Sequence, residues 1–201
     1  MGCMRLFTAL ELPEAITDEI CLWWLQARYH LDPDQWRPIK PHRWHITLAF
    51  YGDVSAHDAD DLAEMLAVCA DASPPLQLCL DGCGIYPQAS RPRVFWAGVQ
   101  PSSADPALKH LARCCRRAGH VTVRNRTARE DPFRAHITLA RANGHLPAML
   151  DLQALPPVPE LSWQADHLCL FQSMLHADGA QYRQLERFEC RGARTQYRVR
   201  G

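Results

Sequence analysis

The chain has 201 residues, of which 47% are hydrophobic and 22% charged, and its 22 basic and 22 acidic side chains cancel. This composition is typical of a globular domain and excludes a disordered, collagenous or fibrous protein. No apolar run approaches the roughly 20 residues that a membrane span requires, so no membrane partner is expected.

The predicted elements mix helices with strands that are adjacent in sequence. In chain order, we expect a strand at 5–10, a helix at 14–29, a loop at 32–38, a strand at 44–50, a helix at 59–70, strands at 76–80 and 94–99, a helix at 106–118, a loop at 119–134, a strand at 136–140, and an antiparallel pair at 161–171 and 182–189. Asp58 is expected to cap the second helix and Gly119 to end the third. The tail 191–201 is expected to be loose.

This element order predicts an α+β fold with antiparallel sheets rather than a doubly wound fold. The sequence has no glycine-rich phosphate loop, which argues against nucleotide-binding folds of the P-loop and dinucleotide types. Nine cysteines, an odd number without a Cys-x-x-Cys pair, indicate reduced thiols in a cytoplasmic protein, and Glu11 and Pro13 interrupt any signal peptide. No ligand spacing supports a zinc site, so neither a metal nor a cofactor is expected.

One pentapeptide, His-Ile-Thr-Leu-Ala, occurs twice, at 45–49 and 136–140. Identity over five residues in so short a chain indicates two copies of one supersecondary unit, one in each lobe. Alternate residues of a strand face opposite sides, so the His and Thr of each copy share one face and the Ile and Leu share the other. If an approximate two-fold axis relates the lobes, both polar faces meet across one cleft.

Two imidazoles and two hydroxyls in one cleft suit phosphate ester chemistry. One His accepts a proton from the nucleophile and the other donates a proton to the leaving oxygen, and a pKa near 6.5 allows both roles at neutral pH. The Thr hydroxyls donate hydrogen bonds to the non-bridging oxygens. The sequence therefore predicts His45 and His136 as catalytic residues and Thr47 and Thr138 as substrate-binding residues, without a metal.

These motifs resemble those of the 2H phosphoesterase superfamily, and most of all the RNA 2′,3′-cyclic phosphodiesterase family, also called 2′,5′ RNA ligase. The resemblance covers nearly the whole chain: MRLFTALELP is similar to the opening strand, WHITLAFYGDV to the first motif, GIYPQASRPRVFWAGV to the central hairpin, FRAHITLAR to the second motif and LCLFQSMLHADGAQYRQL to the final strand pair. It implies one bilobal, pseudo-two-fold domain over residues 1–201, with antiparallel sheets that line a central cleft.

The resemblance also implies an activity and roles. The activity is hydrolysis of RNA 2′,3′-cyclic phosphate ends to 2′-phosphates, together with reversible 2′,5′ ligation, in a monomer whose substrates are RNA or tRNA fragments. His45 corresponds to the general acid at the departing O3′, His136 to the general base that activates water, and Arg141 to a phosphate contact. Arg141 lies five residues after His136, so a regular strand would point it away from the cleft, and we expect the strand to end or bulge near Ala140.

Alternatives remain open at this point. The same site suits a phosphodiesterase for small cyclic or 2′,5′-linked nucleotides, or a nucleotide-binding module without turnover. The charge is uneven, because residues 1–100 carry 7 basic and 13 acidic side chains (net −6) and residues 101–201 carry 15 and 9 (net +6). An RNA backbone is one candidate ligand for the arginines Arg124, Arg126, Arg129 and Arg134, and Trp44, Phe50 and Tyr51 are candidates for stacking a base.

Overall fold

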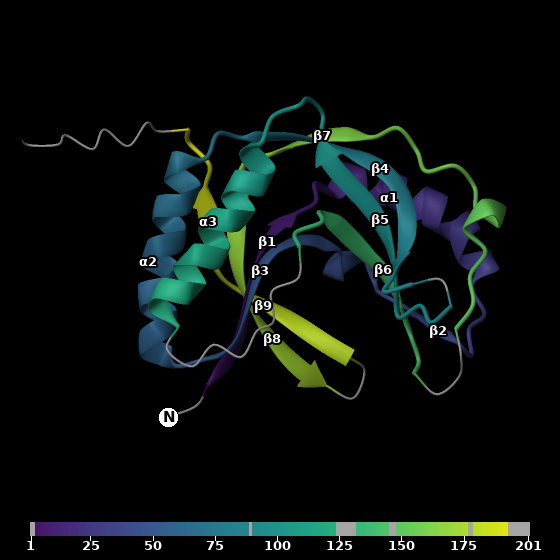
Figure 1. The fold of residues 1–201 in the computed structure, drawn as a ribbon, viewed down its shortest axis with the longest axis horizontal. Helices are drawn as coiled ribbons and strands as arrows, with labels where there is room; N and C mark the ends of the chain where they lie inside the picture. Colours follow the sequence, from purple (N-terminus) through teal and green to yellow (C-terminus); the bar gives the residue numbers. More distant parts are fainter. Residues whose placement is uncertain (1–2, 89, 124–131, 145–147, 177–178, 193–201) are drawn as a thin grey trace, which may run out of the picture.

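The computed structural model describes residues 3–88, 90–123, 132–144, 148–176 and 179–192 (Figure 1). The helices are α1 (Glu14–Ala27), α2 (Ala56–Ala72) and α3 (Ala107–Thr122), with 3₁₀ turns at Arg28–His30, Pro41–Arg43 and Leu152–Ala154. The strands are β1 (Met4–Glu11), β2 (Trp36–Pro38), β3 (His45–Val54), β4 (Leu76–Tyr86), β5 (Val94–Pro101), β6 (His136–Ala142), β7 (Ser162–Ala165), β8 (His167–His176) and β9 (Gly179–Glu189).

Within these ranges the strands form one antiparallel sheet in the order β7-β4-β5-β6-β3-β1-β8-β9, and β2 pairs with β6. The order divides the sheet into two lobes of four strands, β3-β1-β8-β9 and β6-β5-β4-β7, that mirror each other about the contact between β3 and β6. The sheet curls so that the two lobes open away from this contact (Figure 1). The predicted bilobal α+β architecture with antiparallel sheets is confirmed.

Helices cover the convex side of each lobe (Figure 1). Helices α2 and α3 pack on each other and on the lobe that contains β3, β8 and β9. Helix α1 covers the other lobe, where the rings of Trp23 and Trp24 lie 6.5 and 6.0 Å from the ring of Phe95 on β5. These layers bury the apolar faces of the strands, including Ile46 and Ile137 of the two repeats, and leave the opposite faces to line the cleft.

Four sequence predictions about local structure are wrong. The segment expected to be one strand at 161–171 is divided into β7, which pairs with β4, and β8, which pairs with β9. Trp36–Pro38 is a strand and not part of a loop, because it pairs with β6 and Trp36 is buried. Ser55 and not Asp58 caps α2, since the Ser55 hydroxyl accepts a hydrogen bond from the Asp58 amide. Gly119 lies inside α3 and does not end it.

The reason for Gly119 is steric. A Cβ at this position would lie 2.5 Å from Cδ1 of Tyr51, so the helix needs a glycine where the buried Tyr51 ring crosses it. The Tyr51 hydroxyl bonds to the Thr8 hydroxyl at 2.7 Å and donates to the Cys115 carbonyl at 3.2 Å, which ties β3 to both β1 and α3. Gly119 therefore permits the close packing of α3 on β3.

None of the helices in the described ranges is long and apolar enough to cross a membrane. Residues 124–131 of the predicted 119–134 loop and 193–201 of the predicted tail lie outside the described residues, and so do Arg124, Arg126 and Arg129.

Candidate active site

The two copies of the pentapeptide meet at the centre of the sheet. Ile46 of β3 and Ile137 of β6 are direct antiparallel partners. An antiparallel pair centred there sets each His opposite the Thr of the other copy, as an approximate two-fold axis requires. Strand geometry therefore brings the polar faces of β3 and β6 to one side, and the predicted meeting of the two motifs across one cleft is what the structure shows.

Backbone carbonyls orient both imidazoles in the same way. His45 Nδ1 lies 2.7 Å from the Arg43 carbonyl, and His136 Nδ1 lies 2.8 Å from the Arg134 carbonyl. A carbonyl only accepts, so each Nδ1 carries the hydrogen and each Nε2 is left to exchange a proton. On His45 this Nε2 lies 3.1 Å from the Thr47 hydroxyl. The arrangement is that of two oriented acid–base groups.

A bulge in each motif strand determines which later side chain reaches the cleft. Thr8 pairs with Ala49 and Ala9 with Thr47, and Phe95 pairs with Ala140 and Trp96 with Thr138, so that Leu48 and Leu139 are skipped. Each extra residue reverses the alternation of the strand beyond it. Phe50 and Arg141, which follow these bulges at equivalent places, thus turn to the cleft face. The bulge expected near Ala140 is present, one residue earlier.

The cleft has a volume of about 360 Å³ and brings together all five predicted site residues. It is lined by Arg5, Phe7, Ile39, Arg43, His45, Thr47, Phe50, His136, Thr138, Arg141, Ser173, Leu175, Ala180 and Tyr182. Arg5, Phe7 and Tyr182 were not found from the sequence, because no local motif connects these distant strands. The ring of Phe7 lies 5.0 Å from that of His45, Tyr182 lies edge-on to His45 at 5.2 Å, and the Arg5 guanidinium lies 5.0 Å from the ring of Phe50.

This environment favours the neutral form of both imidazoles. Burial lowers the pKa of His45 to about 4, and the nearby His136 and Arg141 act in the same direction, whereas the Arg43 carbonyl and the Glu11 carboxylate oppose it. Burial also lowers the pKa of His136, again with help from Arg141. A bound phosphate anion would counter this positive field and raise both pKa values.

Two of the aromatic candidates lie elsewhere. Trp44 and Tyr51 are buried in the core, where neither ring can stack on a ligand. Phe50 alone of the three lines the cleft, with Phe7 and Tyr182 as its aromatic companions. The base-stacking expectation therefore applies to Phe50 and not to its two neighbours.

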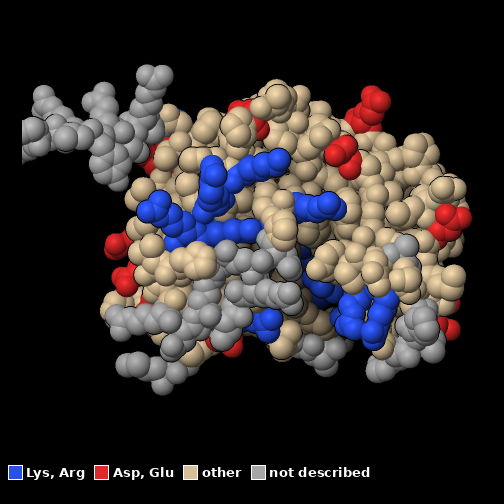
Figure 2. All heavy atoms as spheres, viewed as in Figure 1, with Lys and Arg blue, Asp and Glu red and all other residues tan. Residues whose placement is uncertain are grey.

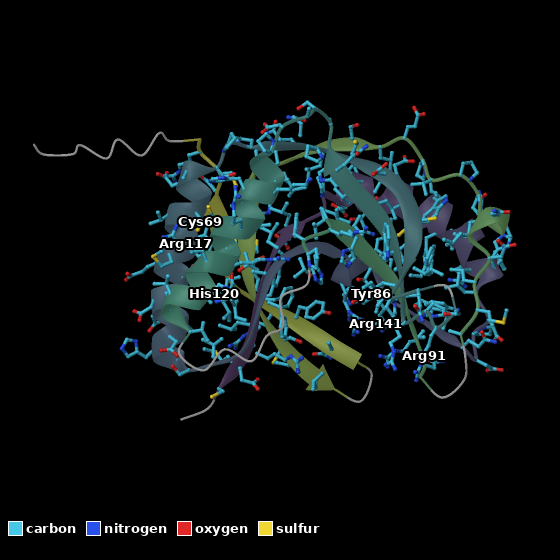
Figure 3. The ribbon with its side chains drawn as sticks, viewed as in Figure 1. Cys69, Tyr86, Arg91, Arg117, His120 and Arg141 are labelled. Carbon is cyan, nitrogen blue, oxygen red and sulfur yellow. The ribbon has the colours of Figure 1, made fainter. Side chains whose placement is uncertain are left out.

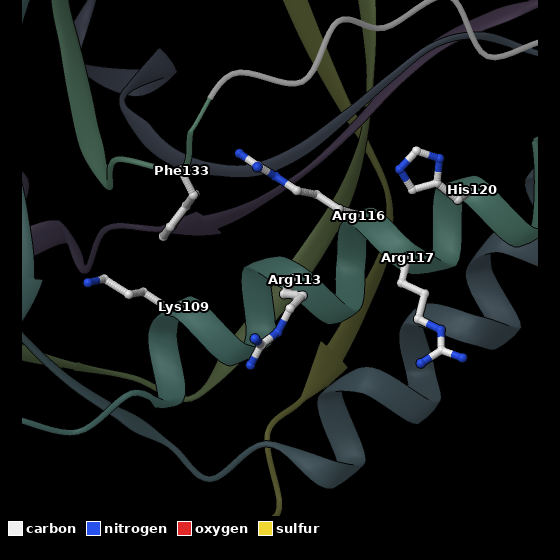
Figure 4. A pocket seen from close by; sticks show the side chains of 6 residues that line it. All are labelled: Lys109, Arg113, Arg116, Arg117, His120 and Phe133. Carbon is white, nitrogen blue, oxygen red and sulfur yellow. The ribbon is translucent and has the colours of Figure 1, made fainter.

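A second concave surface lies on α3 (Figures 2 and 4). It has a volume of about 310 Å³ and is lined by Lys109, Arg113, Arg116, Arg117, His120 and Phe133. The sequence of α3 contains no Asp or Glu, and no carboxylate within the described ranges forms an ion pair with these four cations. Figure 2 shows basic side chains over α3 and again in the region where Figure 3, in the same view, labels Arg91 and Arg141.

The α3 surface adjoins the second motif. The Arg116 guanidinium lies 5.6 Å from the ring of Phe133, and Figure 4 shows Arg116 reaching toward that ring. Phe133 precedes His136 by three residues, so their Cα atoms are at most about 11 Å apart. Apart from both surfaces, Glu11, His167 and Cys169 bring three possible metal ligands within 4.8 Å of one another.

Comparison with known proteins gives a consistent result. The model of the 2′-5′ RNA ligase superfamily matches residues 16–175. A Thermus thermophilus protein named RNA 2′,3′-cyclic phosphodiesterase is 30% identical over 204 residues, which cover 98% of this chain and 96% of that protein. The crystal structure of Thermus thermophilus TT0787 superposes with a TM-score of 0.80 at 28% identity, covering 95% of this chain and all of that one. Escherichia coli LigT complexed with 3′-AMP gives a TM-score of 0.75 at 28% identity, covering 93% and 98%.

Proposed function

The chain belongs to the 2′-5′ RNA ligase superfamily, and on that basis we propose that it hydrolyses the 2′,3′-cyclic phosphate ends of RNA to 2′-phosphates. The observation that carries this proposal is the cleft in which two oriented His-x-Thr motifs face each other beside Arg141. A 5′-hydroxyl that attacks phosphorus in place of water, with the same base and the same acid at O3′, would give a 2′,5′ link.

The geometry suits an in-line displacement at phosphorus. Arg141 and the hydroxyls of Thr47 and Thr138 hold the non-bridging oxygens. Nε2 of His136 takes a proton from water as the water oxygen attacks phosphorus, and Nε2 of His45 gives a proton to O3′ as the P–O3′ bond breaks. The product keeps its phosphate on O2′, and the two imidazoles have exchanged protonation states.

The acid role of His45 depends on the substrate. Its pKa of about 4 leaves it neutral at pH 7 in the free protein. The negative phosphate of a bound substrate stabilises the imidazolium, so the acid is charged when the substrate is in place. We assign the acid to His45 and the base to His136, and the next experiment distinguishes this assignment from its reverse.

The test compares two substrates of different leaving-group quality. An activated aryl phosphodiester needs little protonation of its leaving oxygen, so His45→Ala should lose several orders of magnitude in kcat/KM on a ribose cyclic phosphate and far less on the aryl ester. His136→Ala should be impaired on both, because water still needs its base. Rescue of His136→Ala alone would reverse the two roles, and rescue of neither would leave both residues as phosphate binders.

We further propose that catalysis proceeds without a metal ion, because each proton transfer has its own imidazole and the phosphate charge has its own guanidinium. Turnover of the cyclic phosphate should survive excess chelator. Loss of turnover in chelator, with recovery on addition of one divalent ion, would contradict this proposal.

We infer that the substrate is an RNA chain whose nucleotides before the cyclic phosphate end lie along α3. Arg113, Arg116 and Arg117 suit phosphate because the guanidinium fork donates two parallel hydrogen bonds. Phe133 supplies an aromatic ring at the same surface. Because Phe133 lies only three residues before His136, a single RNA chain can reach from the cleft to α3.

Chain length is the variable that tests this inference. Arg113→Gln/Arg117→Gln should raise KM for an oligonucleotide with a 2′,3′-cyclic end and reduce the slope of log(kcat/KM) against log[salt] by about 0.7 for each phosphate that the variant no longer neutralises. Turnover of a cyclic mononucleotide should not change. Arg28→Gln, which removes an exposed cation near α1, is the matched control. Equal effects on both substrates, or none on either, would favour a small cyclic nucleotide as substrate.

We treat residues 1–201 as one functional unit, because each lobe supplies only one His-x-Thr motif. All nine cysteines are free, which supports our placement of the reaction in the reducing cytoplasm.

A further inference from the structure

A group of potential metal ligands lies where β1 ends beside β8. Glu11 is the last residue of β1, and His167 and Cys169 lie on β8. The Cys169 Sγ and the His167 Nε2 each lie 3.2 Å from the same oxygen, Oε2 of Glu11. His167 follows Glu11 by 156 residues, so no spacing in the sequence indicates this group.

These separations match those between ligands of one tetrahedral zinc ion. Zn–S of about 2.3 Å and Zn–N or Zn–O of about 2.0 Å imply ligand atoms about 3.3–3.5 Å apart. All three potential ligand atoms lie within 4.8 Å of one another, so closure around an ion needs only a small side-chain adjustment. Cys169 is fully buried, His167 is mostly buried, and Glu11 is 39% exposed, which leaves one open side.

A second carboxylate orients the imidazole. Asp166 Oδ1 lies 2.6 Å from His167 Nδ1 and Glu11 Oε2 lies 3.2 Å from Nε2, so each ring nitrogen faces a carboxylate oxygen. An ion bound at Nε2 would take the place of a hydrogen there, and Nδ1 would keep its hydrogen for Asp166. A carboxylate behind a ligating histidine is the usual support of protein zinc sites, because it fixes the ring and increases its basicity. The Arg187 guanidinium lies 3.1 Å from the same Nδ1; because a guanidinium only donates, beside this N–H it acts as a positive charge near Asp166 and not as a hydrogen-bond partner of the ring.

We propose that Glu11, His167 and Cys169 form a zinc-binding site, with Asp166 as the supporting residue and a fourth position open to solvent. One thiolate, one imidazole and one carboxylate are ligands that zinc prefers over magnesium or calcium. Two carboxylates, one thiolate and one guanidinium leave a net charge of −2, which a divalent cation neutralises. Binding replaces the Cys169 thiol proton by the metal, so at least one proton passes to the buffer for each ion bound.

The site lies outside the catalytic cleft. None of its four residues lines that cleft, although the Glu11 carboxylate acts on the pKa of His45, and the proposed hydrolysis needs no metal ion. A failure of the hydrolysis proposal and a failure of the zinc proposal are therefore distinguishable.

The experiment titrates the full chain with Zn²⁺ by calorimetry and with Co²⁺ by absorption. We expect one equivalent of tight binding, proton release, and a thiolate-to-cobalt charge-transfer band. Cys169→Ser and His167→Gln should each weaken affinity by about 100-fold or more, and Asp166→Asn by about 10- to 100-fold. The Cys169→Ser variant should also lose the charge-transfer band.

Cys69→Ser is the matched control, because Cys69 is a thiol that is paired with another thiol, Cys114, and belongs to no part of the proposed site. It should bind both metals as the wild type does. Three results would overturn the proposal: no tight binding, unchanged binding in both Cys169→Ser and His167→Gln, or loss of binding in Cys69→Ser instead.

Discussion

Replacing His45 by asparagine should make the protein less sensitive to acid. Burial holds the pKa of His45 at about 4 in the folded chain, whereas an unfolded histidine titrates near 6.5. Between these values the unfolded chain binds a proton that the folded chain does not, so this residue adds nothing above pH 7 and increasingly destabilises the fold as the pH falls to 4. The gap of 2.5 units amounts to about 3 kcal/mol at 1.36 kcal/mol per unit. Asparagine can still donate to the Arg43 carbonyl and does not titrate.

Urea denaturation of both proteins at several pH values measures this term. The difference in unfolding free energy, wild type minus His45→Asn, should fall by about 3 kcal/mol between pH 7.5 and pH 4, and most of the fall should come below pH 6.5. A difference that stays constant across this range would refute the claim that burial keeps His45 neutral. Titration of the His45 ring protons by NMR, with and without inorganic phosphate, checks the same claim directly, and phosphate should raise the pKa.

Four further predictions concern the site and its support. Because burial lowers the pKa of both imidazoles, both limbs of a bell-shaped kcat/KM profile should lie below pH 6.5, and those of kcat at higher pH; a single rise to pH 10 would contradict the pairing. In Arg141→Met, NMR titration should show a higher pKa for both imidazoles. Thr47→Ala or Thr138→Ala should lower kcat/KM roughly 10- to 150-fold, since one hydrogen bond to a charged oxygen is worth about 1.5–3 kcal/mol. Gly119→Ala should destabilise the fold by about 1–3 kcal/mol in urea melts, because its Cβ would overlap the Tyr51 ring; unchanged stability would show that the ring can move.

The site was predictable from sequence where a local pattern carries it. The repeated pentapeptide places His and Thr on one face of each strand, and the pairing of Ile46 with Ile137 joins those faces. Arg141 lies an odd number of residues after His136, so it can face the cleft only if the strand bulges, and the structure has that bulge at Leu139. A bulge is detectable in this way only when a residue is required on a known face, so the matching bulge at Leu48 was not predicted.

Two of the errors share one cause, which is a tertiary contact that overrides a local signal. Glycine is common at helix C-termini, which is why Gly119 was expected to end α3. The Tyr51 ring of β3 instead requires a glycine inside the helix. Pro38 and its neighbours suggest a loop, yet pairing with β6 makes them a strand. Phe7 and Tyr182 line the cleft from strands that are far apart in sequence. The residue pattern of either strand alone does not predict that these rings meet at the cleft.

The most direct test of the account is the identity of the product from an RNA that ends in a 2′,3′-cyclic phosphate. With wild-type protein in chelator, ³¹P NMR should show conversion to the 2′-phosphate, and His45→Ala and His136→Ala should each nearly abolish it. A 3′-phosphate product, or wild-type rates in both variants, would contradict the claim that the two facing His-x-Thr motifs protonate O3′ and activate water at one phosphate.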